Sequence, residues 1–140
     1  SVAERIGKWS LSYRDAAHAA KIARRLRAQQ PLYSADLGIY TLLARDDLRS
    51  DLLGLRDKMI GKLLAHDERQ RADLLQTLEA FFEAHGNATQ TAEKLSVHRN
   101  TLFYRMNRIQ EILDLDLNQT DVRLALHLSL KIHRLLAEDT

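Results

Sequence analysis

The residues best suited to chemistry lie close together around position 100 and carry groups that recognise DNA bases. The guanidinium of Arg99 can make a bidentate pair with guanine, and the amide of Asn100 can do the same with adenine. Thr101 can contact a phosphate or the methyl group of thymine. These three side chains have the hydrogen-bonding groups that a DNA major groove requires.

A second set of side chains is better suited to the DNA backbone than to its bases. Arginine guanidinium groups and a phenol hydroxyl can fix the register of a protein on the phosphates. The amino end of a helix adds to this, because its backbone N–H groups point outward. The residues of this set are Tyr104, Arg105 and Arg108, together with Asn87, Thr89 and Gln90.

Two helices joined by a tight turn are needed to position both sets. The spacing predicts a short helix capped by Asn87 and ending at Leu95, in which Gln90 completes a capping box. After a break at Ser96 and Val97, a longer helix is expected from His98 to about Leu113. This layout, over residues 87–113, is that of a DNA-binding helix-turn-helix.

The second helix divides into a buried side and an outward side. Ala92 must be small where the helices cross, and Leu95 and Val97 would fill the angle between them. The predicted buried stripe of the second helix is Leu102, Met106, Ile109 and Leu113. The predicted outward residues are Arg99, Asn100, Phe103, Tyr104, Asn107 and Arg108, with Thr101 and Arg105 at the border.

Two positions in this segment leave alternatives open. His98 could cap the second helix or touch DNA, and both roles are consistent with its place. Ser96 stands where glycine is usual in the turn of such motifs, so an ordinary helical hairpin with a solvated polar face remains an alternative. In functional terms, the rival hypothesis is a helical protein-interaction or dimerisation module that does not bind DNA.

The rest of the chain also reads as helical, because it has one proline and five glycines in 140 residues. The last element shows two conflicting patterns, because its leucines from Leu124 to Leu130 alternate with other residues as in a strand. The element is too long for a typical strand, so we expect a helix that is apolar on two sides. Further helices are expected over residues 13–29 and from Asp36, and residues 46–66 are expected to form one or two helices. Another helix is expected over 69–85, with Gly86 as its left-handed end, and the last from a cap at Thr120 to about 137.

Composition excludes several classes of protein. The absence of cysteine rules out disulfides and thiolate metal sites, and no apolar run is long enough for a membrane span or a signal peptide. His127 and His133 are six residues apart, which does not suit a metal site, and no catalytic constellation is visible. The net charge of +2 carries no functional information. We therefore expect no enzyme, no metal and no cofactor.

Residues 69–136 resemble the C-terminal helix-turn-helix domain of PucR/CdaR-type bacterial transcriptional regulators. The likeness rests on the string HRNTL at 98–102, the Tyr104-Arg105 pair and the run RLALHL at 123–128. The motif is similar to that of Fis-type proteins, whose second helix reads bases. By position, this resemblance implies groove contacts at His98, Arg99 and Thr101, followed by Phe103 and Tyr104.

Two departures from the family pattern accompany the resemblance. Leu113-Asp114 stands where Thr-Gly is usual after the second helix, so the helix end is expected to differ there. Phe103 occupies a position where a basic residue is common, which favours apolar contact with a thymine methyl over a phosphate contact. Residues 1–44 are similar to the tail of a degenerate GGDEF-like domain, without the Gly-Gly-Asp-Glu-Phe string itself.

These observations together predict an all-α protein, a helical bundle containing a Fis-like helix-turn-helix. The expected division is a domain remnant over 1–44 and a DNA-binding domain over 45–140. The resemblance implies a cytoplasmic regulator that binds double-stranded DNA as a homodimer, with any small-molecule effector bound by a domain upstream of this chain.

Overall fold

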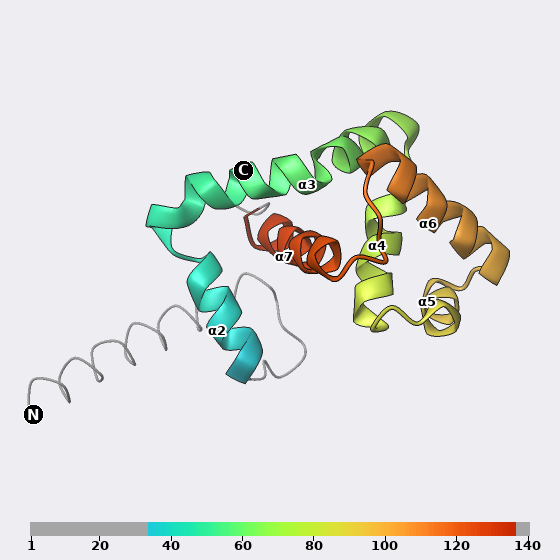
Figure 1. Ribbon diagram of the computed structural model, residues 1–140, viewed down its shortest axis with the longest axis horizontal. Coiled ribbons are helices and arrows are strands. Elements are labelled where there is room, and N and C mark those ends of the chain that lie inside the picture. Colours follow the sequence, from blue (N-terminus) through green and yellow to red (C-terminus); the bar gives the residue numbers. More distant parts are fainter. Residues whose placement is uncertain (1–33, 137–140) are drawn as a thin grey trace, which may run out of the picture. The chain divides into compact units, whose positions relative to one another are not determined.

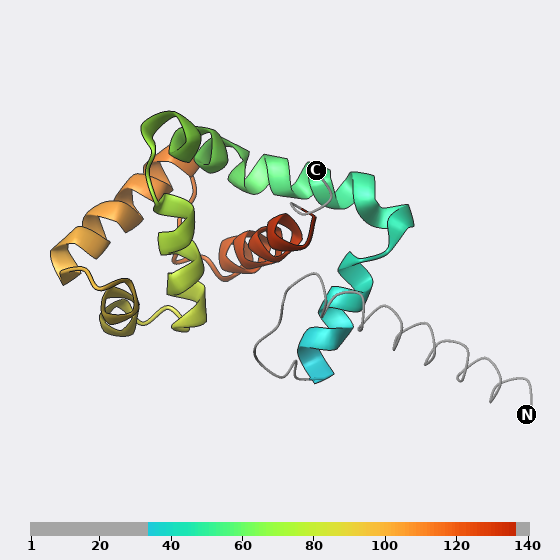
Figure 2. The ribbon, with the colours of Figure 1, turned by 180° about the vertical axis from the view of Figure 1, so that it is seen from behind.

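Every element that the structure describes is helical. The computed structural model describes residues 34–136, and Figures 1 and 2 show their arrangement from two opposite sides. Among these residues the prediction of an all-α fold is confirmed, whereas the helix predicted over residues 13–29 lies outside them. The elements are α2 (Ser34–Leu43), the 3-10 turn η1 (Asp46–Leu48), α3 (Arg49–Gln70), α4 (Leu74–Glu83), α5 (Ala88–Leu95), α6 (Arg99–Leu113) and α7 (Thr120–Leu136).

The chain divides into two compact units, with boundaries after Leu53 and after Lys131. The first unit contains α2, η1 and the last residues of α7, and an exposed ion pair lies at the start of η1. There Arg45 donates to both carboxylate oxygens of Asp47, over 3.0 and 2.5 Å, and these hydrogen bonds lower the pKa of Asp47. The second unit, Gly54–Lys131, contains the segment predicted to bind DNA. The domain division expected at residue 44 stays a prediction.

Helix α3 is one continuous helix, although Gly54 and Gly61 lie within it. It extends to Gln70, so the prediction that this helix ends at residue 66 is wrong. The prediction that the next helix begins at Arg69 is also wrong, because Arg69 still lies in α3. The chain turns at Arg71, whose φ of 49° is left-handed, and α4 begins at Leu74. None of the helices in the described range is long and apolar enough to cross a membrane.

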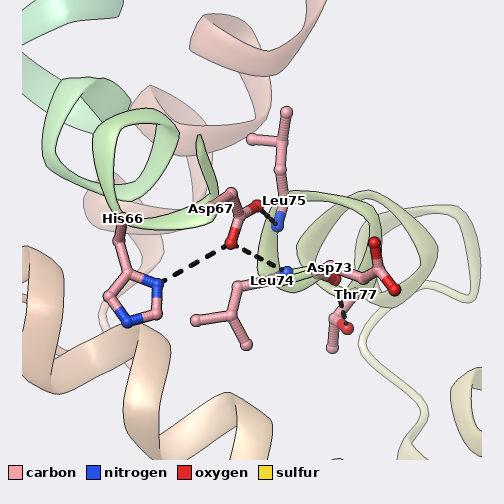
Figure 3. A network of polar contacts seen from close by, with 6 residues as sticks. All are labelled: His66, Asp67, Asp73, Leu74, Leu75 and Thr77. Atoms are coloured by element: carbon pink, nitrogen blue, oxygen red, sulfur yellow. Dashed lines mark hydrogen bonds and ion pairs between the residues drawn. The ribbon is translucent and has the colours of Figure 1, made fainter. Parts of the chain in front are cut away.

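The amino end of α4 is capped from a distance. The carboxylate of Asp67, in the last turns of α3, accepts hydrogen bonds from the backbone N–H groups of Leu74 and Leu75 over 3.2 and 2.8 Å (Figure 3). Asp73, the residue directly before α4, makes no such side-chain bond, and its backbone carbonyl accepts from the Thr77 hydroxyl instead. The cap therefore comes from the tertiary structure rather than from the adjacent residue.

One apolar core lies at the centre of the second unit, where α4, α5 and α6 pack against one another. The buried stripe predicted for α6 is confirmed, because all four of its residues belong to this core. The core residues are Ile60 and Leu63 of α3, Leu74, Leu78 and Phe81 of α4, Ala92 of α5, Leu102, Met106, Ile109 and Leu113 of α6, Leu117, and Leu126 and Leu130 of α7.

Helix α7 settles the conflict between strand and helix periodicity in favour of a helix. Its leucines do not share one environment, since Leu126 and Leu130 are buried whereas Leu124 is 67% exposed. Thr120 is already the first helical residue, so the prediction that it lies outside the helix as a cap is wrong. Part of the apolar surface of α7, at Leu124, therefore faces solvent in the single chain.

The cap on α4 can be tested with a pair of aspartates. Asp67→Ala should lower the free energy of unfolding by about 1 to 2 kcal/mol, because it leaves two helix N–H groups without an acceptor. Asp73→Ala is the matched control and should cost only a few tenths of a kcal/mol, since its carboxylate merely adds charge near the helix end. Urea denaturation followed by circular dichroism measures both. Equal losses for the two variants would contradict the distant cap.

Candidate nucleic-acid interface

The turn between α4 and α5 depends on Gly86, as predicted. Its φ of 76° is left-handed, and its N–H donates to the carbonyl of Phe81 over 2.9 Å. A methyl group added there would lie 3.0 Å from Nη1 of Arg123 and 3.4 Å from the Phe81 ring. Glycine is therefore favoured both by the backbone conformation and by the close approach of Arg123.

Arg123 connects the start of α7 to the entrance of the α5–α6 segment. Its Nε donates to the carbonyl of Leu117 over 2.5 Å, and its guanidinium lies 5.3 Å from the centre of the Phe81 ring. The position was singled out only through the family resemblance, and its contacts with Phe81 and Gly86 were not foreseen. Arg123 therefore helps to place the turn that leads into α5.

Asn87 caps α5, as its spacing predicts. Its Oδ1 accepts from the backbone N–H of Gln90 over 3.0 Å, and its carbonyl accepts from the buried Thr91 hydroxyl over 2.7 Å. The reciprocal half of the capping box differs, because the backbone N–H of Asn87 donates to the carbonyl of Ala84 over 3.0 Å. Asn87, Thr89 and Gln90 are all exposed at this helix end.

The turn between α5 and α6 accommodates a serine where glycine is usual. Ser96 has φ 55° and ψ 42°, a left-handed conformation that costs a residue with a Cβ about 1 to 2 kcal/mol. The N–H groups of Ser96 and Val97 donate to the carbonyls of Glu93 and Ala92 over 3.1 and 3.0 Å. The predicted break is confirmed, and an ion pair between Lys94 and Glu83 further ties α5 to α4.

His98 caps α6. Its Nδ1 accepts from the backbone N–H of Asn100 over 3.1 Å, and its backbone is extended. In a neutral ring this arrangement leaves the proton on Nε2, which remains a hydrogen-bond donor on an exposed side chain. Of the two roles left open by the sequence, capping is thus observed, and contact with DNA stays a prediction.

The exposed face of α6 has the composition that the sequence predicts. Tyr104 is 70% exposed and Phe103 is 45% exposed, whereas Leu102 between Thr101 and Phe103 is buried. Thr101, expected at the border, is fully on the exposed side. The exposed residues of the helix from its start to the third turn are Arg99, Asn100, Thr101, Phe103, Tyr104, Asn107 and Arg108.

Three arginines on α6 have different environments. The guanidinium of Arg99 lies over the Phe103 ring, 5.3 Å from its centre. Arg108 is exposed and forms an ion pair with Glu111, one turn further on, over 3.1 Å. Arg105 is only partly exposed, and its Nη1 donates to the Thr77 hydroxyl on α4 over 3.4 Å.

Thr77 was not foreseen from the sequence. It is fully buried in α4 and its hydroxyl both donates to the Asp73 carbonyl and accepts from Arg105 (the α4 end of this network is shown in Figure 3). A polar residue inside the apolar stripe of α4 was the signal available in the sequence. The geometry makes Arg105 a link between α6 and α4, so of the predicted backbone contacts it is the one that points least toward solvent.

The histidines were also considered as possible metal ligands. In the part of the chain that is described, no three histidine, aspartate or glutamate side chains come together as metal ligands. His127, one of the two histidines considered above, lies with its ring stacked on Phe82 at a centroid distance of 4.9 Å.

Helices α5 and α6 pack against each other and are joined by a left-handed turn, and α6 has a capped amino end and an exposed polar face. This arrangement defines a helix-turn-helix domain. Comparison with known proteins agrees: residues 74–132 match the family model described as PucR C-terminal helix-turn-helix domain. Residues 74–132 are therefore a PucR-type C-terminal helix-turn-helix domain, as the resemblance implied.

Relatives with assigned names are similar over different lengths. The DNA-binding transcriptional activator AdeR of Bacillus subtilis is 30% identical over 90% of this chain, which covers 30% of AdeR. The proline-responsive transcriptional activator PutR of the same species is 33% identical over 89% of the chain and 31% of PutR. The carbohydrate diacid regulator of Escherichia coli is 44% identical over 42% of the chain and 15% of that regulator.

The chain spans about a third of the length of AdeR and PutR. No solved structure matches it.

The Gly86 turn gives a testable prediction with an internal control. Gly86→Ala should lower the free energy of unfolding by about 1 to 3 kcal/mol, because a Cβ is strained at this φ and displaces the Arg123 guanidinium. Gly54→Ala, in an exposed part of α3 with open space around it, should instead raise stability by up to about 1 kcal/mol. Thermal and urea unfolding measure both. A neutral Gly86→Ala variant would show that Arg123 and the turn can adjust freely.

Proposed function

We propose that this chain is the DNA-binding part of a bacterial transcriptional regulator, in which α6 enters the major groove and α5 braces it against the backbone. The observation that carries the proposal is the exposed face of α6, where Arg99, Asn100 and Thr101 follow one another at the capped end of the helix. These side chains can pair with guanine, adenine and phosphate or thymine methyl, respectively. The role is one of binding, not catalysis.

The proposed contacts fall into two groups. Base contacts are assigned to the first turns of α6, and phosphate contacts to its later arginine and to the amino end of α5, where backbone N–H groups also point outward. The proposed base-contacting residues are His98, Arg99, Asn100, Thr101, Phe103 and Tyr104. The proposed backbone-contacting residues are Arg105, Arg108, Asn87, Thr89 and Gln90.

Pairing of two copies is part of the proposal. Helix-turn-helix proteins commonly read two half-sites about 34–36 Å apart along the DNA, which requires a dimer. Leu124, exposed on α7, is an apolar contact that a second copy could cover. The same residue favours the alternative function, a helical interaction or dimerisation module without DNA binding. A cytoplasmic location and an effector bound by an upstream domain complete the proposal.

The deciding experiment selects duplexes for the 140-residue chain from a randomised DNA pool and measures their binding by fluorescence anisotropy at several salt concentrations. Enriched duplexes with a two-fold symmetric sequence and salt-sensitive affinity would support the regulator and its pairing. A dimeric chain without any salt-sensitive binding would instead establish the interaction module.

Base recognition by Arg99 gives the first prediction. On a selected duplex, Arg99→Ala should weaken binding by about 1 to 3 kcal/mol and relax base preference at one position of each half-site. Repeating the selection with the variant measures the preference. Unchanged affinity and an unchanged selected sequence would exclude Arg99 from base recognition.

Arg108 provides a prediction about phosphates, with Glu111 as its counterpart. Arg108→Ala should weaken binding to all duplexes alike and make the dependence of log affinity on log salt shallower by about one unit. Glu111→Gln removes the ion-pair partner of Arg108 and a carboxylate near the DNA, so it should strengthen binding to all duplexes up to about fivefold. Sequence-dependent effects of either substitution would contradict a pure phosphate contact.

A further inference from the structure

Arg99 and Phe103 form a pair on the surface of α6 that has no role in the core. They lie one helical turn apart, and the guanidinium of Arg99 is 5.3 Å from the centre of the Phe103 ring. Both side chains are exposed, and Phe103 keeps 45% of its surface in contact with solvent. The cation above this partly exposed ring is attracted to the negative face of its π system.

The pair has two chemically different faces to offer to DNA. The guanidinium has N–H groups in a planar fork that matches the two acceptors of guanine. The phenylalanine ring has no hydrogen-bonding group, so a base edge made of donors and acceptors would lose hydrogen bonds to water against it. Among the four base pairs, the thymine methyl is the apolar group in the major groove.

We propose that Arg99 and Phe103 read a guanine and a neighbouring thymine as one unit. Phe103 covers the thymine methyl, and its ring holds the Arg99 guanidinium in the orientation that pairs with guanine. The inference rests on the proposed function and deepens it, because it names the dinucleotide chemistry that this part of α6 recognises. Asn100 and Tyr104, which also lie on the exposed face of α6, would contact the other bases of the half-site.

The stack also predicts that the two residues are coupled. Loss of Phe103 removes a methyl contact and frees the guanidinium, whereas loss of Arg99 removes the guanine contact and leaves the ring unsupported. The loss of affinity in the double variant should therefore be smaller than the product of the two single losses.

The test removes single chemical groups from the DNA bases. In a duplex selected for the 140-residue chain, each thymine is replaced in turn by deoxyuridine, which lacks only the methyl group. At one thymine per half-site, we expect affinity to fall about fourfold, the value that corresponds to burial of one methyl-sized group. Replacing the neighbouring guanine by 7-deazaguanine, which lacks one of the two acceptors, should weaken binding at least as much.

Variants assign these effects to the two residues. Phe103→Ala should make the selected thymine and deoxyuridine duplexes bind equally well, while Phe103→Leu, which keeps an apolar side chain, should retain a difference of at least about twofold. Arg99→Ala should remove the response to 7-deazaguanine. Leu42→Ala, which truncates an exposed apolar residue of α2 that has no part in the proposed interface, is the matched control and should leave both responses unchanged.

The outcomes separate this inference from the proposed function. If the selected duplex binds but deoxyuridine has no effect at any position, or if its effect persists in Phe103→Ala, the inference is overturned and DNA binding stands. If selection enriches no duplex, the inference falls together with the proposed function. Circular dichroism of each variant confirms that the exposed substitutions leave the fold intact.

Discussion

The buried stripe of α6 is the contact on which the helix-turn-helix depends, because α4 and α5, which pack against α6, are too short to be stable alone. Helices α4 and α5 have 10 and 8 residues, lengths at which isolated helices are marginal in water. Leu102 and Ile109 are almost completely buried and bring α6 into the same core as α4 and α5. Burying this stripe also decides which side chains of α6 remain exposed, so the packed face and the proposed DNA-binding face lie on opposite sides of one helix.

Side chains from distant parts of the sequence hold the ends of these short helices. Asp67 caps α4 from the preceding helix, and Arg123 lies between the Leu117 carbonyl and the Phe81 ring beside Gly86. These contacts satisfy groups near the start of α4 and between α6 and α7 from another part of the chain, whereas α5 and α6 are capped by the adjacent Asn87 and His98. Asp67 and Arg123 thus help to hold α4 and the turn that leads into α5, the two helices against which α6 packs.

Recognition in the proposed interface depends on the position of a few groups rather than on bulk charge. The chain has a net charge of only +2, and two of the α6 arginines already have partners within the protein. Arg105 supports α6 through Thr77, and Arg108 is paired with Glu111, so Arg99 on its aromatic ring is the arginine most suited to reading a base. In the proposed interface Arg99 would contact a base and Arg108 a phosphate, whereas Arg105 also bonds to Thr77 within the protein.

Periodicity and capping chemistry by themselves determined the all-helical class, the two helices around Ser96, the buried stripe of α6 and the exposed residues opposite it. These features are local, since they depend on residues three or four apart in one helix. The tertiary structure alone decided that Asp67 caps α4, that α3 runs to Gln70 and that Arg105 bonds to Thr77. Asp67 and Leu75 are 8 residues apart and Arg105 and Thr77 are 28 apart, so no helical period relates them. Only the packing of α3, α4 and α6 into one core brings them within hydrogen-bonding distance.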